Sequence, residues 1–277
     1  MDFSTARQRF YQEINQPDAQ IDRAKAALYI AQEDYPDLDV EFYLQQLDQM
    51  AAAVARHLPQ ERYPLRVIKA INAHLYDELG FVGNTDDYYD PRNSFLNQVL
   101  ERRTGIPITL SLVYLEIAKR LEFPMVGVAM PGHFLIRPVL DDMQVFVDPF
   151  HQGEVMFEQD CQERLNQLYG LPVTLQPQFL DAVGAKRFLM RMLGNLKLVY
   201  LSQSNWDKTL AAIERMLLLS PEEPMALRDR GLIYYRMGRW VEASHDLERY
   251  LAIASDAKEI STIQHLLERM RGQVGDR

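Results

Sequence analysis

The sequence predicts an α+β protein that is mostly helical, and three observations lead to this fold class. Helical periodicity fills the first third of the chain, short strand-like segments follow helices in the middle, and the last third repeats itself. Helices followed by neighbouring strands are typical of an α+β fold with a small antiparallel sheet. We expect an N-terminal helical region (1–79), a core that holds the sheet (80–183) and C-terminal helical repeats (184–277).

The composition is that of a folded protein. Hydrophobic residues make up 47% of the 277 residues and charged residues 25%, so the chain carries enough apolar side chains for a sizeable core. A single cysteine, Cys161, cannot form an intramolecular disulfide, and no stretch approaches the ~18 consecutive apolar residues of a membrane span. The net charge of −9 argues against nucleic acid and anionic membranes as partners. We therefore expect a soluble, cytoplasmic protein.

Three helices are expected in the N-terminal region. The middle one repeats apolar residues at spacings of three and four, and Asp37 or Asp39 is placed to cap its start. These apolar residues are Leu44, Leu47, Ala51, Val54 and Leu58. A shorter helix precedes it and stops before Pro36, and a third follows and ends at Gly80. We expect these helices to support the core.

The core begins with a loop and two helices. Residues 80–95 (GFVGNTDDYYDPRNSF) have the glycine, asparagine, aspartate and proline content of a loop. The helix after the loop opens at Asn93 or Ser94. The next helix begins near Pro107, because the missing N–H of proline costs nothing in a first helical turn.

Three short strands are expected after these helices. They cover residues 125–130, residues 133–137 and the segment QVFVDPF. Alternation along a strand puts Phe146 and Asp148 on the same side of the last one. Cys161 comes later, in an apparently helical stretch, where we expect a buried small apolar residue.

The last third of the chain repeats with a period of 34 residues. Equivalent pairs are Tyr200 and Tyr234, Trp206 and Trp240, and Ile213 and Leu247. Thirty-four residues is the period of tetratricopeptide repeats, each of which is a pair of helices. We expect two repeats closed by a final capping helix.

Such an array presents a concave groove that binds proteins or peptides. Asn195, Tyr200 and Arg228 are the residues expected to line it, since they come from the first helix of each pair. They do not form the cluster of lysines expected for an acidic peptide tail, so the partner stays unidentified. The alternative is that the repeats only brace the core.

Three segments of the core resemble the SirB-type family of bacterial proteins: GFVGNTDDYYDPRNSFLNQVLERRTGIPITLSLVYLEIAKRL, PGHFLIRP and VDPFHQG. That family combines a transglutaminase-like domain with tetratricopeptide repeats. The resemblance implies a papain-like core, in which a cysteine at a helix start attacks, a histidine takes its proton and an aspartate orients the histidine. His133 and Asp148 match the histidine and the aspartate, whereas Pro107 stands where the cysteine is expected.

Two hydroxyl groups could replace the missing thiol. Thr109 is turned about 200° around the helix from Pro107, which favours a capping role. Ser111 returns near the same face but lies about 6 Å along the axis, so it reaches His133 only if the helix is shifted. Either hydroxyl would need His133 as a base within about 3 Å.

The region around His133 also allows ligand sites without a nucleophile. A metal site would recruit His151 with His133 and Asp148, but the step across Pro149 is not a specific ligand spacing, so we predict no metal and no cofactor. The acids of DDYYDPRNSF do not alternate around a glycine as in a calcium loop. Asn93 is expected in a turn and helix cap, and a binding role for it stays open.

Two functional hypotheses follow. The favoured one is a non-catalytic interaction or regulatory protein, a pseudoenzyme that keeps His133 and Asp148 for binding and uses the repeats to hold a partner. The alternative is a peptide or amide hydrolase, or an acyltransferase, in which Asp148 orients His133 and the nucleophile is Ser111 or Thr109.

Overall fold

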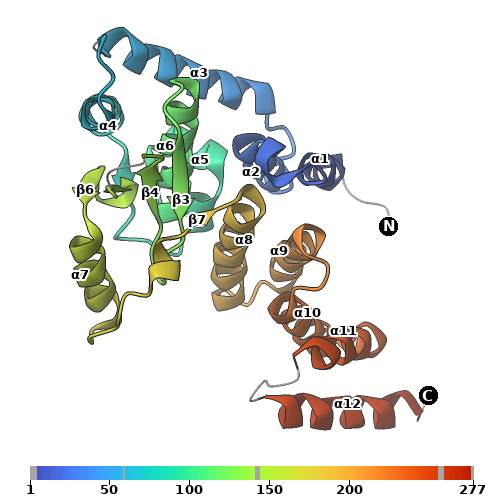
Figure 1. Ribbon diagram of the computed structural model, residues 1–277. Helices are drawn as coiled ribbons and strands as arrows, with labels where there is room; N and C mark the ends of the chain where they lie inside the picture. Colours follow the sequence, from blue (N-terminus) through green and yellow to red (C-terminus); the bar gives the residue numbers. More distant parts are fainter. Residues whose placement is uncertain (1–4, 59, 141–143, 255–258, 276–277) are drawn as a thin grey trace. The chain divides into compact units, whose positions relative to one another are not determined.

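The computed structural model describes residues 5–58, 60–140, 144–254 and 259–275. The chain divides into two compact units, 1–192 and 193–277, and helix α8 (Ala185–Ser202) spans the division. The first unit combines helices with a small antiparallel sheet, and the second is helical (Figure 1). The expected α+β class is confirmed, while the three-part division at 79 and 183 stays a prediction. Among the described helices none is long and apolar enough to cross a membrane.

The N-terminal part of the first unit consists of helices. They are α1 (Thr5–Ile14), α2 (Arg23–Ala31), α3 (Val40–His57) and α4 (Pro64–Asn72). Of the two expected caps of α3, the structure uses Asp39, whose side chain accepts from two backbone N–H groups of the first turn. After α4 the chain continues as a π-helical segment (Ala73–Glu78). This helical stretch ends at Gly80, which has a φ of +71°.

The sheet of the first unit has five antiparallel strands in the order β6-β5-β4-β3-β7. Their bounds are β3 (Met125–Val128), β4 (Leu135–Pro138), β5 (Phe146–Asp148), β6 (Glu154–Met156) and β7 (Ala182–Val183). Helix α6 (Pro107–Arg120) packs against β3 and β4, and its residues 107–118 are buried (Figure 1). Because α6 is surrounded by other elements, it forms the centre of this unit.

Two expected boundaries differ from the structure. Helix α5 (Leu96–Arg102) begins later than Asn93 or Ser94, because these two residues belong to a 3-10 turn whose start is capped by Asp90. Strand β4 begins at Leu135 and not at 133, because Gly132 has a φ of +74° and the N–H of His133 donates to the carbonyl of Met130 in a turn. His133 therefore lies just before the strand.

Three further elements of the first unit complete the surroundings of the sheet. A short parallel pair joins β1 (Val82–Gly83) to β2 (Thr104–Gly105), directly before α6. Helix α7 (Glu158–Tyr169) follows β6. Cys161, on α7, is fully buried in an apolar cluster with residues such as Phe146 and Leu165.

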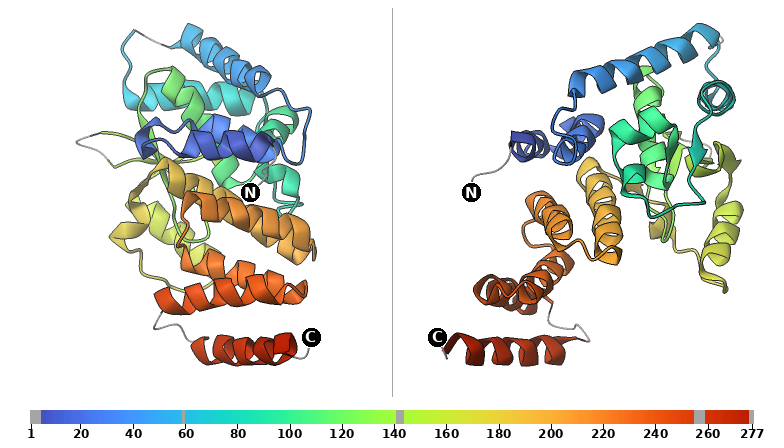
Figure 2. Two further views of the ribbon diagram at one scale, coloured as in Figure 1. Left: turned by 90° about the vertical axis from the view of Figure 1, so that its right-hand side faces the viewer. Right: turned by 180° about the vertical axis from the view of Figure 1, so that it is seen from behind.

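The second unit has the helical pairs expected of tetratricopeptide repeats (Figure 2). After α8 come α9 (Trp206–Leu219), α10 (Pro224–Arg236), α11 (Trp240–Ile253) and α12 (Ile260–Gly275). Both tryptophans begin the second helix of a pair, as their spacing of 34 residues predicts. Gly231 allows α10 to approach α11, since a Cβ there would lie 2.7 Å from Cγ of Leu247. Helix α12 packs on α11 at the end of the array.

Candidate functional site

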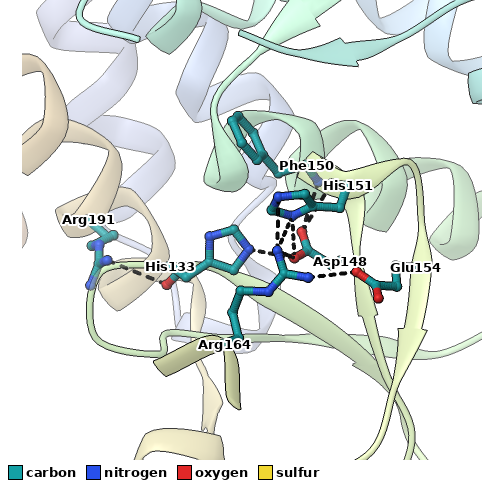
Figure 3. Close-up of polar contacts among 7 residues, drawn as sticks. All are labelled: His133, Asp148, Phe150, His151, Glu154, Arg164 and Arg191. Carbon is teal, nitrogen blue, oxygen red and sulfur yellow. Dashed lines mark hydrogen bonds and ion pairs between the residues drawn. The ribbon is translucent and has the colours of Figure 1, made fainter. Parts of the chain in front are cut away.

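The expected histidine and aspartate meet in the first unit. Asp148 is the last residue of β5, and His133 stands on the turn before β4, which pairs with β5. Nε2 of His133 lies 2.7 Å from Oδ2 of Asp148, and both side chains are buried (Figure 3). In the neutral ring Nε2 donates to the carboxylate, which leaves Nδ1 as the acceptor nitrogen. Among the described residues, no group forms a hydrogen bond with Nδ1.

Both carboxylate oxygens of Asp148 have hydrogen-bond partners. Its Oδ1 accepts from the backbone N–H groups of Phe150 and His151, at 3.1 and 3.3 Å, and so caps the 3-10 turn Pro149–His151. Its Oδ2 also contacts Nδ1 of His151 at 2.8 Å. Burial acts to raise the pKa of Asp148, but the hydrogen bonds from the two histidines outweigh it and hold this pKa well below its usual range. The carboxylate is therefore charged at neutral pH.

Arg164, from α7, contacts His151 and lies near Asp148. Its Nη1 lies 2.8 Å from Nδ1 and 2.9 Å from Nε2 of His151, and 3.8 Å from Oδ2 of Asp148 (Figure 3). Its Nη2 lies 2.6 Å from Glu154 on β6. Sequence reasoning missed Arg164, because only the return of α7 to the sheet brings it to the site.

The N-terminus of α6 reaches the same region through a chain of contacts. Strand β2 precedes α6 and pairs with β1, whose Gly83 leaves no room for a side chain, since a Cβ there would lie 2.6 Å from the Phe150 ring. The Phe150 ring in turn lies edge-on to the ring of His133, with 6.1 Å between their centres. Helix α6 also contacts the turn Pro149–His151 directly.

Neither candidate hydroxyl is bonded to His133. Pro107 is the first residue of α6, Ile106 is the N-cap, and Thr109 caps the helix with its side chain from within the first turn. Oγ1 of Thr109 accepts from the N–H of Ile106 at 3.1 Å and donates to the carbonyl of Asn93 at 2.7 Å. Oγ of Ser111 is buried and has no hydrogen-bond partner in the described part of the chain. The structure thus joins His133 to Asp148 but leaves both hydroxyls outside the pair.

Comparison with known proteins agrees with this architecture. The family profile described as the transglutaminase-like superfamily matches residues 41–194, and one for the tetratricopeptide repeat matches residues 196–268. A UPF0162 protein of Xylella fastidiosa (strain 9a5c) is 39% identical over 251 residues, which cover 87% of this chain and 88% of that protein. The chain belongs to the UPF0162 family.

Two other relatives show the range of this similarity. A UPF0162 protein of Vibrio cholerae is 30% identical and covers 73% of this chain and 75% of its own length. Human F-box only protein 21 is 30% identical over 95% of this chain, but the match covers only 45% of that protein. The transglutaminase-like core and the repeats expected from the sequence are thereby confirmed for this UPF0162 protein.

Asn93 and Cys161 have structural surroundings in this UPF0162 protein. The amide of Asn93 is buried, donates to the carbonyls of Asp87 and Tyr88 and accepts from Asn84, so it holds the loop of residues 84–93 together. Burial raises the pKa of Cys161 to about 12, with smaller contributions from nearby acids. Its thiol therefore stays protonated, as expected for a packing residue.

The His133, Asp148 and His151 side chains also form a possible metal donor set. Their ligand atoms lie within 4.8 Å of one another. Arg164 already places a positive charge against His151 and Asp148, so a divalent cation could bind all three only if Arg164 moved away. That this chain uses no metal stays a prediction.

The expected groove residues of the repeats differ in exposure. Tyr200 is only 4% exposed and Lys208 lies over its ring, at 5.3 Å from the centre. Arg228 is held by Asp229 and Glu259, and Asn195 is half-buried. The exposed apolar side chains of the first helices are others: Leu198 and Leu201 on α8, and Met225 and Leu232 on α10.

Proposed function

We propose that this UPF0162 protein is a non-catalytic, cytoplasmic interaction protein. Its His133–Asp148 pair would serve to bind a ligand, and its repeats would hold a protein partner. The observation that carries the proposal is Pro107 at the first position of α6, where the resemblance expects the nucleophilic cysteine. Proline offers no nucleophile, and it also lacks the N–H that would help stabilise a negative charge at a helix start.

The surroundings of the pair support this proposal. A hydroxyl nucleophile needs a base within about 3 Å to take its proton. The hydroxyl of Thr109 is occupied by the cap of α6, and that of Ser111 has no partner among the described residues. Among the described residues, neither hydroxyl is therefore held to His133 by a hydrogen bond, although Asp148 fixes the ring of His133.

The repeats support a protein partner for the second unit. Leu198 and Leu232 are 34 residues apart and hold equivalent positions on the first helices of successive pairs. Both are exposed, at 54% and 37%. Leu201 and Met225 add to the exposed apolar surface of the same helices. Apolar side chains repeated in this way suit the contact surface of a helical-repeat binder.

The catalytic part of the proposal is tested on the full chain with peptide and amide substrates. We expect no turnover above background for the unmodified protein, and no change in His133→Ala. Hydrolysis or acyl transfer that disappears in His133→Ala and in either Ser111→Ala or Thr109→Ala would overturn it and establish the alternative, a hydrolase or acyltransferase with a hydroxyl nucleophile. The observation that favours this alternative is the fixed ring of His133, whose Nδ1 has no hydrogen bond among the described residues.

The interaction part is tested by cross-linking in lysate, read by mass spectrometry. The double variant Leu198→Glu with Leu232→Glu should lose proteins captured by the unmodified chain. Val241→Glu, at a position on α11 that is 70% exposed, is the matched control and should retain them. Equal capture by both variants would show that the partner does not use this apolar surface.

A further inference from the structure

We propose that Arg191 binds the carboxylate of a peptide C-terminus beside His133. This inference rests on the proposed binding role of the His133 site and names its ligand. Arg191 lies on the part of α8 that belongs to the first unit. Its guanidinium reaches the turn that carries His133, where Nη2 lies 3.5 Å from the carbonyl oxygen of His133 (Figure 3). The same Nη2 lies 3.5 Å from the carbonyl oxygen of Met130.

Arg191 has no carboxylate partner in the described part of the chain. Its two carbonyl contacts are long for hydrogen bonds, and the ionisable groups that influence it are the phenols of Tyr88 and Tyr169. Burial lowers the pKa of Arg191, although the guanidinium stays charged at neutral pH. A half-buried cation without a counter-ion favours an anionic ligand.

Several other arginines of this chain are neutralised internally. Five of them hold a carboxylate at 2.5 to 2.7 Å: Arg92, Arg120, Arg164, Arg228 and Arg230. Four of these five are half-buried like Arg191, and Arg92 is exposed. Arg191 pairs with no carboxylate in the described part of the chain and lies beside the turn that carries His133, so an anionic ligand at that turn could pair with it.

The neighbours of Arg191 indicate the rest of the ligand. Tyr88 is 37% exposed, and its ring centre lies 6.2 Å from that of Phe150, which flanks the ring of His133. Tyr89, which packs edge-on against Tyr88, is 62% exposed. Exposed aromatic rings linked through Phe150 to the ring of His133 suit a ligand that carries an apolar side chain next to its carboxylate. The unbonded Nδ1 of His133 offers a further polar contact.

A monoanion fits this region better than a phosphate does. Asp148 and Glu154 already place two negative charges around His151 and Arg164, so a doubly charged ligand would be repelled more strongly than a singly charged one. A carboxylate could come from a peptide C-terminus or from an aspartate side chain. We infer the C-terminus, because there the carboxylate and an apolar side chain stand on the same residue.

The experiment measures peptide binding to the full chain by calorimetry and by the imidazole resonances of His133 and His151. The probe is N-acetyl-Ala-Phe with a free carboxylate, compared with its C-terminal amide and with N-acetyl-Asp-Phe-amide. We expect saturable binding of the free acid, at least tenfold weaker binding of the amide, and a shift of the His133 resonance. Arg191→Met should weaken binding of the free acid at least tenfold, and Arg191→Lys should weaken it less.

Arg66→Met is the matched control, since it removes an exposed arginine of α4 and should change affinity less than twofold. Circular dichroism verifies that each variant is folded. Three results would overturn the proposal. They are equal affinity for the free acid and the amide, no binding at peptide concentrations up to about 1 mM, and unchanged affinity in Arg191→Met and Arg191→Lys. Preference for N-acetyl-Asp-Phe-amide would exclude the C-terminus as ligand. Turnover measurements are separate, so catalysis would contradict the proposed function without deciding this binding result.

Discussion

At the scale of single residues, Asp148 connects the parts of the candidate site. One oxygen serves backbone N–H groups of the turn after β5, and the other serves the imidazoles of His133 and His151. A buried carboxylate normally costs free energy, and here four donors offset that cost. The carboxylate therefore orients two histidines and stabilises the fold at the same time.

Asp148→Asn should lower the free energy of unfolding by roughly 3 kcal/mol at pH 7, since it removes a buried charge that accepts several hydrogen bonds. The folded-state pKa of Asp148 is depressed. Its stabilising contribution is therefore present above the unfolded-state pKa of about 3.9 and is lost as the pH falls toward the folded-state value. Urea unfolding should give a constant difference between wild type and variant from pH 7 to about pH 5, and a smaller difference below about pH 4.

Glu154→Gln is the control for this measurement. Glu154 also contacts Arg164, but its side chain is 52% exposed, so its loss should cost less than about 1 kcal/mol. A difference for Asp148→Asn that stays the same at pH 7 and pH 3.5 would contradict the role assigned to its charge.

At the scale of elements, the structure explains which predictions succeed. The starts of α3 and α6 were predictable because Asp39 and Pro107 act through their own backbone neighbours. The pairing of β1 with β2 was not, because each strand has only two residues and depends on tertiary contacts. The π-helical segment Ala73–Glu78 has no comparable local signal either.

The residues of the candidate site also differ in whether the sequence predicts them. His133 and Asp148 were predicted because they stand in recognisable motifs, one just before β4 and the other at the end of the neighbouring strand β5. Arg164 and Arg191 were not, because they come from α7 and α8; Arg191 is 58 residues from His133 in sequence. A sequence pattern does not report which helix returns to a strand end, so the positive charges of the site became visible only in three dimensions.

The contribution of the α6 cap to stability can be measured with a single substitution at Thr109. Thr109→Val should destabilise the protein by about 2 kcal/mol, since it leaves the N–H of Ile106 and the carbonyl of Asn93 without their buried partner. Thr109→Ser keeps the hydroxyl and should recover at least half of that loss. Urea unfolding of the two variants provides the measurement, and a neutral Thr109→Val would show that the cap does not stabilise α6.

At the scale of the whole molecule, the two units differ in how their cores are built. The first unit is centred on α6, whose neighbours come from several parts of the chain. In the second unit each helix packs mainly on the next one, from α9 to α12. Repeat arrays of this kind open locally, because each contact stabilises only its nearest neighbours. The helices of the second unit should therefore exchange amide protons more readily than strands β3 to β5.

Gly231→Ala tests this difference in local stability. A Cβ at Gly231 would lie 2.7 Å from Cγ of the buried Leu247, so α10 and α11 must move apart at a cost of about 1–3 kcal/mol. Hydrogen exchange measured by mass spectrometry should become roughly tenfold faster in α10 and α11 and stay unchanged in β3 to β5. Gly194→Ala is the matched control, since a Cβ there meets no atom within 4 Å, and it should leave the protein equally or slightly more stable. Equal acceleration in the helices and the strands would mean that the two units open as one cooperative structure.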